Sequence, residues 1–312
     1  MHKPFYPELC KRYEDFDFKR KSLISKLLYY FTFDQNGIIH LQFTALEGGK
    51  KRYFPITVQQ YALMQYNQYA KTHSPAVKEA FLKHADWLLQ SLKIKGKLAY
   101  WPYTWPMRIA GYAWRKPYDW ASCIAQGQGL SVLIRAHSLT KNIKYLTLVK
   151  NILRSFETDY RISGGVLEVD EQGNKWYLEF PATLKHGRVL NGLLYSLIGL
   201  YEYYSYTKDK QAKSLFEAGK NTIAANLDHY DLDYGFFKWS RYDDQQIFYT
   251  GRRYHLRVLL PQLKILYKIT SDKRFKRKYE QWKQWAEHYA LQSKLLDLPL
   301  LAIQKLRAYL PF

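Results

Sequence analysis

The sequence has few cysteines, no long apolar run and no recognisable leader. Cys10 and Cys123 stand far apart and match no disulfide or metal-ligand spacing, so neither kind of framework is expected, and Cys123 is predicted to be a core residue. No window approaches the about 18 uninterrupted apolar residues of a spanning helix. Residues 1–15 also lack the apolar centre of a secretory signal. These absences predict a reducing, cytoplasmic setting and no membrane span.

The motifs of several enzyme classes are also missing. The chain has no Gly-rich phosphate loop of Walker or Rossmann spacing and no zinc-finger pattern. Its nine histidines include no helical pair with an intervening Glu, and no Gly-x-Ser-x-Gly elbow occurs. Nucleotide-dependent, zinc-dependent and serine-hydrolase chemistries are therefore disfavoured. We expect no cofactor and no metal.

Acidic residues are scarce relative to basic ones. The chain has 27 Asp and Glu against 48 Lys and Arg, which gives a net charge of +21. Such an excess favours a polyanionic partner, either nucleic acid, an anionic membrane surface or an acidic polysaccharide. The alternative is solvated charge scattered over the surface. The basic clusters are short, at Lys50–Arg52, Arg252–Arg253 and Lys273–Lys278. A nucleic-acid role would depend on charge alone, so we expect none.

Aromatic residues, by contrast, are abundant, at 17% of the chain with 29 Tyr. Flat amphipathic rings in that excess suit the apolar faces of sugars. One loop region concentrates them, and several of its members are expected to stack on sugar rings while others fill the core: Trp101, Tyr103, Trp105, Tyr112, Trp114 and Trp120.

A weak internal repeat organises the chain. An apolar-periodic helix, a short polar turn near a threonine and a second amphipathic helix recur four times, with the threonines at intervals of 68, 67 and 63 residues: Thr72, Thr140, Thr207 and Thr270. Repeated helix hairpins cannot bury their apolar faces singly, so they must stack or close into a ring. No Pro/Gly/Ser-rich linker divides the chain, which predicts one domain over residues 1–312, with 1–56 as an N-terminal extension.

Between these hairpins lie extended, aromatic segments. Gly165–Val169 and Lys175–Phe180 flank a glycine-containing turn and predict a β-hairpin. The stretches 37–54, 98–118 and 230–254 also lack a helical period. In a ring of helix pairs, such connections converge on one end and line a cleft. The predicted fold is therefore mainly α, an incomplete (α/α) barrel of about four hairpins with short β-hairpins lining the cleft.

Three side chains in these loops could carry acid–base chemistry. Glu179 lies within the Trp176–Pro181 segment, which we expect to form one lip of the cleft, and desolvation among aromatic neighbours would suit a general acid or base. Tyr254 follows Arg252-Arg253, and nearby cations favour a phenolate. Arg241 offers a bidentate fork for a carboxylate. For each residue the alternative is a structural role, as a paired carboxylate, a packed ring or a solvated arginine.

Gln126-Gly127-Gln128-Gly129 is predicted to open a helix over Leu130–Thr140. The glutamines could bind sugar hydroxyls, whereas the glycines indicate tight helix–helix packing.

Two runs resemble a known family. Asp119–Gln128 and Val189–Tyr201 are similar to the C-terminal α/α-barrel domain of the D-glucuronyl C5-epimerases, which convert D-glucuronate to L-iduronate in heparosan-type polymers. The similarity extends from about Trp101 to Trp285, with a shorter match at 53–61. It implies a uronic acid C5-epimerase, an isomerase whose partner is a glucuronate-containing acidic poly- or oligosaccharide.

The resemblance also implies roles for individual residues. Glu179 takes the position of a catalytic glutamate, Tyr254 that of a catalytic tyrosine, and Arg241 that of the residue holding the substrate carboxylate. The family's tyrosine after the glutamate is Phe180 here, and its loop tyrosine is Lys238. Substrate binding is expected from further residues in these segments: Lys238, Tyr177, Trp101, Trp120, Gln126, Gln128, Asn191, His255 and Arg253.

Two other functions remain open at this point. One is a uronate polysaccharide lyase or glycoside hydrolase on the same barrel, and the other is a non-catalytic polyanion-binding protein. The sequence does not fix the oligomeric state, and a homodimer is compatible with it.

Overall fold

The computed structural model describes residues 29–43, 49–104, 108–109, 112–113, 119–181, 187–244 and 249–309. The fold is mainly helical, as predicted. Residues 1–28 and 44–48 of the expected N-terminal extension lie outside the described residues, as do Trp105 and Trp114 of the aromatic set. None of the helices in the described ranges is long and apolar enough to cross a membrane.

Four helix hairpins follow one another along the chain. Their first helices are α3 (Pro55–Thr72), α5 (Cys123–Thr140), α8 (Leu190–Thr207) and α11 (Leu260–Thr270). The second helices are α4 (Pro75–Gln90), α9 (Lys210–Asn226) and α12 (Lys273–His288), whereas the second hairpin returns through the short pieces α6 (Lys144–Thr147), α7 (Val149–Leu153) and a 3₁₀ turn at Arg154–Glu157. A further helix, α13 (Ala290–Tyr309), follows the last hairpin.

The repeated threonines end the first helices in the same way. Each hydroxyl donates to the carbonyl four residues earlier and accepts from the N–H two residues later, at 2.6–3.3 Å. The residue after each threonine is left-handed, with φ of 54–62°. This geometry satisfies free carbonyls and turns the chain back. The predicted repeat is thus confirmed, since one local cap recurs four times.

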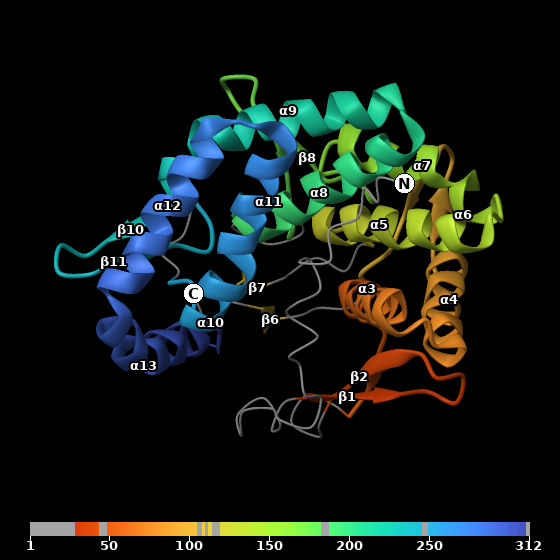
Figure 1. Cartoon of the computed structure of the whole chain (residues 1–312), viewed down its shortest axis with the longest axis horizontal. Helices are drawn as coiled ribbons and strands as arrows, with labels where there is room; N and C mark the ends of the chain where they lie inside the picture. Colours follow the sequence, from red (N-terminus) through yellow and green to blue (C-terminus); the bar gives the residue numbers. More distant parts are fainter. Residues whose placement is uncertain are drawn as a thin grey trace.

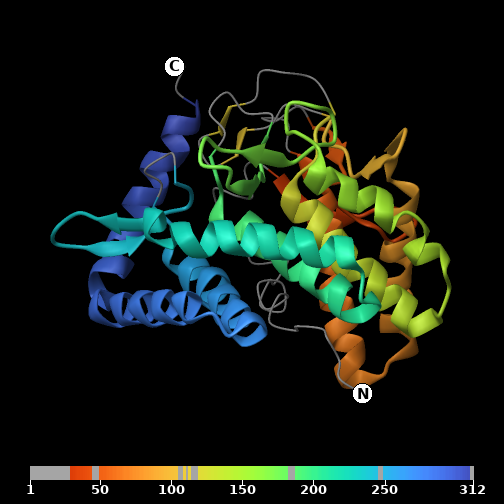
Figure 2. The ribbon, with the colours of Figure 1, turned by 90° about the horizontal axis from the view of Figure 1, so that it is seen from above.

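The first helices pack side by side in chain order, α3 on α5, α5 on α8 and α8 on α11, and α4, α9 and α12 each pack against their own hairpin partner. In Figure 1 the hairpins trace an arc from α3–α4 to α11–α12, and Figure 2 shows α9 across the middle of it. Helices α5 and α8 approach closely, since a Cβ on Gly199 would lie 2.0 Å from the Gly127 carbonyl oxygen, and the tight helix–helix packing that the glycines indicated is confirmed. Helix α5 begins at Cys123, so the prediction that the helix starts only after Gly129 was wrong.

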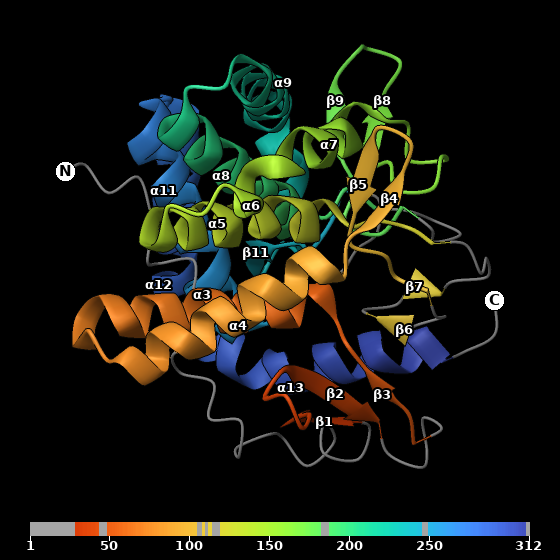
Figure 3. The ribbon, with the colours of Figure 1, turned by 90° about the vertical axis from the view of Figure 1, so that its right-hand side faces the viewer.

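The connections form short antiparallel pairs. β1 (Tyr29–Phe33), β2 (Ile39–Phe43) and β3 (Lys51–Arg52) make one sheet. The pairs are β4 (Lys93–Lys95) with β5 (Leu98–Tyr100), β6 (Arg108–Ile109) with β7 (Tyr112–Ala113), β8 (Leu167–Val169) with β9 (Lys175–Tyr177), and β10 (Asp231–Asp233) with β11 (Lys238–Ser240). The β8–β9 hairpin was predicted. In Figure 3, β4–β5, β6–β7 and β8–β9 lie along one side, and the α3–α4 turn lies at the other.

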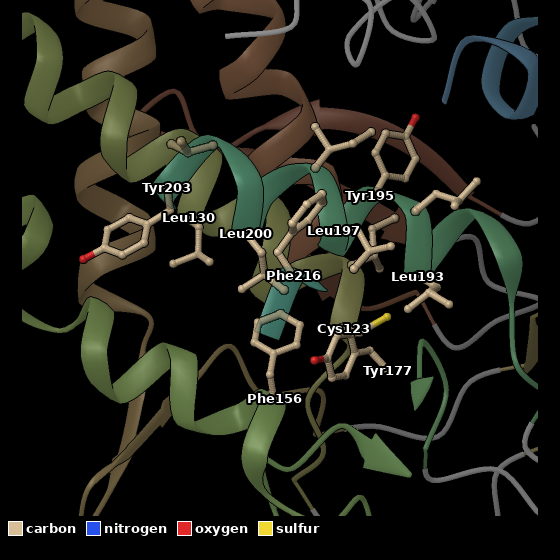
Figure 4. Packing of buried hydrophobic residues seen from close by; sticks show 14 of the residues in the cluster. Cys123, Leu130, Phe156, Tyr177, Leu193, Tyr195, Leu197, Leu200, Tyr203 and Phe216 are labelled. Atoms are coloured by element: carbon tan, nitrogen blue, oxygen red, sulfur yellow. The ribbon is translucent and has the colours of Figure 1, made fainter. Parts of the chain in front are cut away.

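The main core lies between the two layers of helices. Figure 4 shows part of it, with Phe156, Tyr177 and Cys123 packed against α8. Cys123 is fully buried, as predicted. A second, smaller cluster contains Tyr103, Trp120, Phe180 and Val189, and it lies beside the candidate site described next.

Candidate active site

The Glu179 carboxylate rests against the first turn of α8. The chain before it is fixed on both sides, because the Leu178 N–H donates to Val166 and its carbonyl accepts from Cys123 N–H, at 2.8 and 3.0 Å. Glu179 is 5% exposed, and Asn191 Nδ2 donates to its Oε2 at 3.4 Å. A Cβ on Gly192 would lie 2.4 Å from that oxygen, so only glycine leaves the space that the carboxylate fills. The positive end of the α8 dipole favours a negative charge here.

Cys123 is a neighbour of this carboxylate. Burial raises the pKa of the Cys123 thiol well above its usual range, and the charge of Glu179 raises it further. A thiolate nucleophile at this position is therefore disfavoured, since the protonated thiol is the stable form.

The segment that carries Arg241 is hydrogen-bonded to the same turn of α8. The Arg241 N–H donates to the Tyr230 carbonyl at 2.9 Å, and the next carbonyl, of Tyr242, accepts from the Leu190 N–H at 3.2 Å. The guanidinium Nε is buried and has no hydrogen-bond partner among the described residues. An unsatisfied buried donor costs about 1–3 kcal/mol, so a bound carboxylate would relieve a penalty that the free site carries.

Tyr254 closes the arrangement. It ends α10 (Arg252–Tyr254), is half-buried, and its ring lies 6.2 Å from the ring of Tyr242 at 65°. From α11, Gln262 Nε2 donates to the carbonyl of Asn191 at 3.1 Å. Glu179 thus contacts the N-terminal turn of α8 directly. Arg241 and Tyr254 are linked to that turn through Tyr242.

Arg188, which was not predicted from the sequence, connects the segments that carry Glu179 and Arg241. Arg188 Nε donates to Glu168 at 2.9 Å, its Nη1 reaches Asp244 at 3.4 Å, and its guanidinium lies 4.4 Å over the Trp176 ring. Its carbonyl accepts from the Tyr230 hydroxyl at 2.6 Å. Arg188 therefore joins the β8–β9 hairpin, which carries Glu179, to the segment that carries Arg241.

Tyr242, Gln262 and Gly192 were also missed. Tyr242 packs against the cluster that contains Phe180 and Val189 and also against Tyr254, so it bridges the two sides of the site. No local motif marks these three residues, and only their contacts in the folded structure identify them.

Several predicted substrate-binding side chains lie in the core instead. Trp101 and Tyr177 are at most 1% exposed, with the indole N–H on the Leu88 carbonyl and the phenol on the Leu215 carbonyl, both at 2.8 Å. Burial raises the pKa of Tyr177. Gln126 is fully buried, and its amide bonds the backbone of Ala99 and Trp101. We assign these three residues to packing, because their polar atoms are already used.

Trp120 backs the site without lining it. It is 3% exposed, stacks on Tyr103 at 4.2 Å and contacts the Phe180 ring edge-on at 6.4 Å. Gln128 and Asn191 differ from it in having free polar atoms. Both Gln128 amide atoms and Asn191 Oδ1 are buried without a hydrogen-bond partner in the described part of the chain. These atoms can still take a ligand hydroxyl or a water.

Lys238 and Arg253 lie at the periphery. Lys238 pairs with Asp233 at 2.8 Å across the β10–β11 hairpin, which raises its pKa. It stands three residues before Arg241 on an extended segment, about 10 Å along the chain. Arg253 is exposed beside Tyr254. Neither is placed by a described contact against Glu179.

His255 is a buried structural residue. Its Nε2 faces the Trp282 carbonyl at 3.2 Å and must donate, so Nδ1 accepts from the Ser240 hydroxyl at 2.7 Å. The ring stacks on Trp239 at 4.3 Å. Acceptance at Nδ1 requires the neutral imidazole, and burial lowers the pKa of His255 to about 4. Its prediction as a substrate ligand is not supported by this position.

The protein should therefore lose stability in mild acid. Because the folded-state pKa of His255 lies below the unfolded value of about 6.5, the unfolded chain binds more protons between pH 6.5 and 4. The stabilisation is complete above pH 6.5, and about 2 kcal/mol of it should be gone at pH 5. Urea unfolding at pH 7 and pH 5 measures the difference, and His255→Gln should flatten it. An equal slope in both proteins would contradict the assignment.

No group of three or more His, Cys, Asp or Glu side chains that could hold a metal ion occurs among the described residues. The functional groups at the candidate site are a carboxylate, a guanidinium, phenols and amides. Such a set suits proton transfer next to a bound carboxylate.

Comparison with known proteins identifies a family whose name matches this chemistry. Residues 95–284 match the family model described as "D-glucuronyl C5-epimerase C-terminus". A D-glucuronyl C5-epimerase of Caenorhabditis elegans is 34% identical over 168 residues, which cover 50% of this chain and 26% of the nematode protein. The match thus spans about a quarter of that relative's length. Glu179, Arg241 and Tyr254 all lie within the segment that the family model covers.

Proposed function

The chain belongs to the D-glucuronyl C5-epimerase family, whose model covers more than half of it, and we propose that it is a uronic acid C5-epimerase. In this proposal it converts D-glucuronate to L-iduronate residues in an acidic poly- or oligosaccharide. We also propose that its four hairpins form an incomplete (α/α) barrel and a single domain over residues 1–312. The consecutive packing of α3, α5, α8 and α11 supports that architecture.

One observation carries the functional proposal. Glu179 lies against the first turn of α8, the segment of Arg241 and Tyr242 is hydrogen-bonded to that turn, Tyr254 contacts Tyr242, and Arg241 Nε is buried without a described hydrogen-bond partner. Epimerisation at C5 needs two proton-transfer groups, one on each face of the sugar ring, and a cation that stabilises charge on the adjacent carboxylate. The three side chains supply these functions.

In the proposed reaction, the C5–H bond breaks and its electron pair moves onto the uronate carboxylate. One of Glu179 and Tyr254 takes the proton, and the other donates a proton to C5 from the opposite face. Arg241 neutralises the charge that develops on the carboxylate oxygens. Afterwards the two groups exchange protons with water and return to their starting states. The reaction therefore carries solvent hydrogen into C5.

That consequence tests the proposal. A heparosan-type polymer incubated with the protein in deuterated water should gain deuterium at C5, seen by NMR, without becoming shorter. A lyase would cleave the chain and leave an unsaturated product that absorbs in the ultraviolet, and a hydrolase would cleave it without that absorbance. Binding of the polymer with no exchange would leave only a polyanion-binding protein.

Arg241→Lys should lower kcat/KM about 10- to 100-fold, because an ammonium keeps the charge and loses the bidentate fork. The rate of C5 deuterium incorporation measures the effect. Arg277→Lys is the matched control, since Arg277 is exposed on α12 and its described partner is Asp228. Equal rates for Arg241→Lys and the unmodified protein would remove Arg241 from the mechanism.

A further inference from the structure

A groove of about 530 Å³ lies between the turn that joins β1 to β2 and helix α4. Its volume falls within the range of small-molecule binding sites. Figure 3 shows α4 and the β1–β2 sheet in the lower part of the view and β8–β9 at the top, and none of the groove's lining residues belongs to the described cluster that lies beside Glu179. It is lined by Asn36, Ile38, Lys78, Leu82, Lys83, Trp87 and Gln90, among others.

The chemistry of this lining resembles that of a sugar site. Ile38 and Leu82 supply apolar surface, and Trp87 adds a half-buried aromatic ring whose centroid lies 5.2 Å from that of Tyr53. Asn36 and Gln90 place amides in the groove for hydroxyl groups. Aromatic faces and amides together are the groups that bind a pyranose through its C–H face and its hydroxyls.

Two lysines of the groove are available to an anionic ligand, although the lining also contains the acids Glu79 and Asp86. Lys78 and Lys83 have no acidic partner within the described ranges, whereas Asp86 is already occupied by Lys144 at 2.7 Å and the Tyr145 hydroxyl at 2.8 Å. Glu79 and the Asp34 carboxylate of the turn that closes the groove are the other acids near the two lysines. Two free ammonium groups on an aromatic and apolar surface suit a carboxylated sugar better than a neutral one.

The turn that closes the groove is held in place. The Asp34 carboxylate accepts from the N–H groups of Asn36 and Ile38, both at 2.9 Å, and from the Tyr53 hydroxyl at 2.6 Å. Gly37 has φ of 75°, and a Cβ there would meet the Lys83 side chain at 3.9 Å. On the α4 side, His84 Nε2 accepts from the Ile39 N–H at 3.3 Å. A fixed groove loses little entropy when a ligand binds.

We propose that this groove is a second saccharide-binding site, which holds a uronate unit of the acidic polysaccharide away from the catalytic groups. The identity of the ligand rests on the proposed function. One chain that fills both sites gains avidity without any change in the chemistry at Glu179. Long substrates should use the groove, and short ones should be turned over without it.

The test is the double variant Lys78→Glu/Lys83→Glu. Its affinity for a long heparosan chain, measured by isothermal titration, should fall about tenfold at low salt, and the difference should shrink at high salt. C5 deuterium exchange in a tetrasaccharide should stay at the unmodified rate. The matched control is Lys210→Glu/Lys264→Glu, which changes the net charge equally at two exposed lysines on α9 and α11. Circular dichroism melting checks that both variants fold.

The outcomes separate the groove from the epimerase proposal. Unchanged polymer affinity in the groove variant, or an equal loss in the control, overturns the second site and leaves the epimerase assignment intact. If the unmodified protein binds polymer through Lys78 and Lys83 but exchanges no C5 hydrogen, the epimerase proposal fails and the groove stands.

Discussion

Glu179→Gln is expected to lower the rate of C5 hydrogen exchange about 10²- to 10⁴-fold, the usual contribution of a positioned proton-transfer group. Glutamine has nearly the same shape and can still accept from Asn191 Nδ2, so the first turn of α8 should keep its packing. What it loses is the ability to take up and return a proton. The loss should therefore appear in kcat, with polymer affinity little changed.

Two further variants separate chemistry from position. Tyr254→Phe should cause a loss of similar kind, because the phenol is the proposed group on the opposite face. Gly192→Ala keeps both groups but places a Cβ 2.4 Å from the Glu179 oxygen, so it should displace the carboxylate and also lower kcat. Glu171→Gln is the control, an exposed carboxylate in the same β8–β9 hairpin. Full exchange in both Glu179→Gln and Tyr254→Phe would refute the assignment.

The fold was predictable where the signal is local. Each of the four hairpins is marked by a threonine followed within two residues by a polar cap, and the hydrogen bonds that make the turn involve only residues four apart or fewer. The β8–β9 hairpin likewise depends on its own turn, in which Gly173 has φ of 80°. Such features need no information from the rest of the chain.

The start of α5 was not predictable in this way. Gln126–Gly129 were expected to open the helix, with the glycines allowing tight helix–helix packing. In the structure Gly127 and Gly129 lie inside α5 because α8 and Trp101 approach so closely, with a Cβ on Gly129 only 2.1 Å from the Trp101 ring. The cost of the glycines is local, and their benefit is a tertiary contact.

The predicted site residues fall into core residues and candidate site residues because of tertiary contacts, which the sequence does not show. Tyr177 and Tyr254 are both tyrosines in aromatic segments, yet one is 1% exposed with its hydroxyl on a core carbonyl and the other is half-buried beside Tyr242. A residue type indicates what a side chain can do. The packing around it decides whether its polar atom is used in the core, as it is in Tyr177.

The largest stability effect is expected at a buried ion pair between α5 and α8. Arg135 donates from Nη1 and Nη2 to both oxygens of Glu202, at 2.6 and 2.8 Å, and both side chains are fully buried. The guanidinium also donates to the Ser131 carbonyl and lies 5.3 Å from the Tyr66 ring centre. Glu202→Gln should lower the free energy of unfolding by about 3–5 kcal/mol, because it leaves a buried cation without its counter-charge.

Urea unfolding at pH 7 measures this loss, which is a large part of the about 5–15 kcal/mol that stabilises a typical domain. Glu280→Gln is the control, since the exposed pair of Glu280 with Lys276 should be worth at most about 1 kcal/mol. Arg135→Met/Glu202→Leu removes both charges together, so it should cost less than Glu202→Gln. If the double variant were instead the less stable of the two, the penalty would come from lost packing between α5 and α8, and the lone buried charge would not explain it.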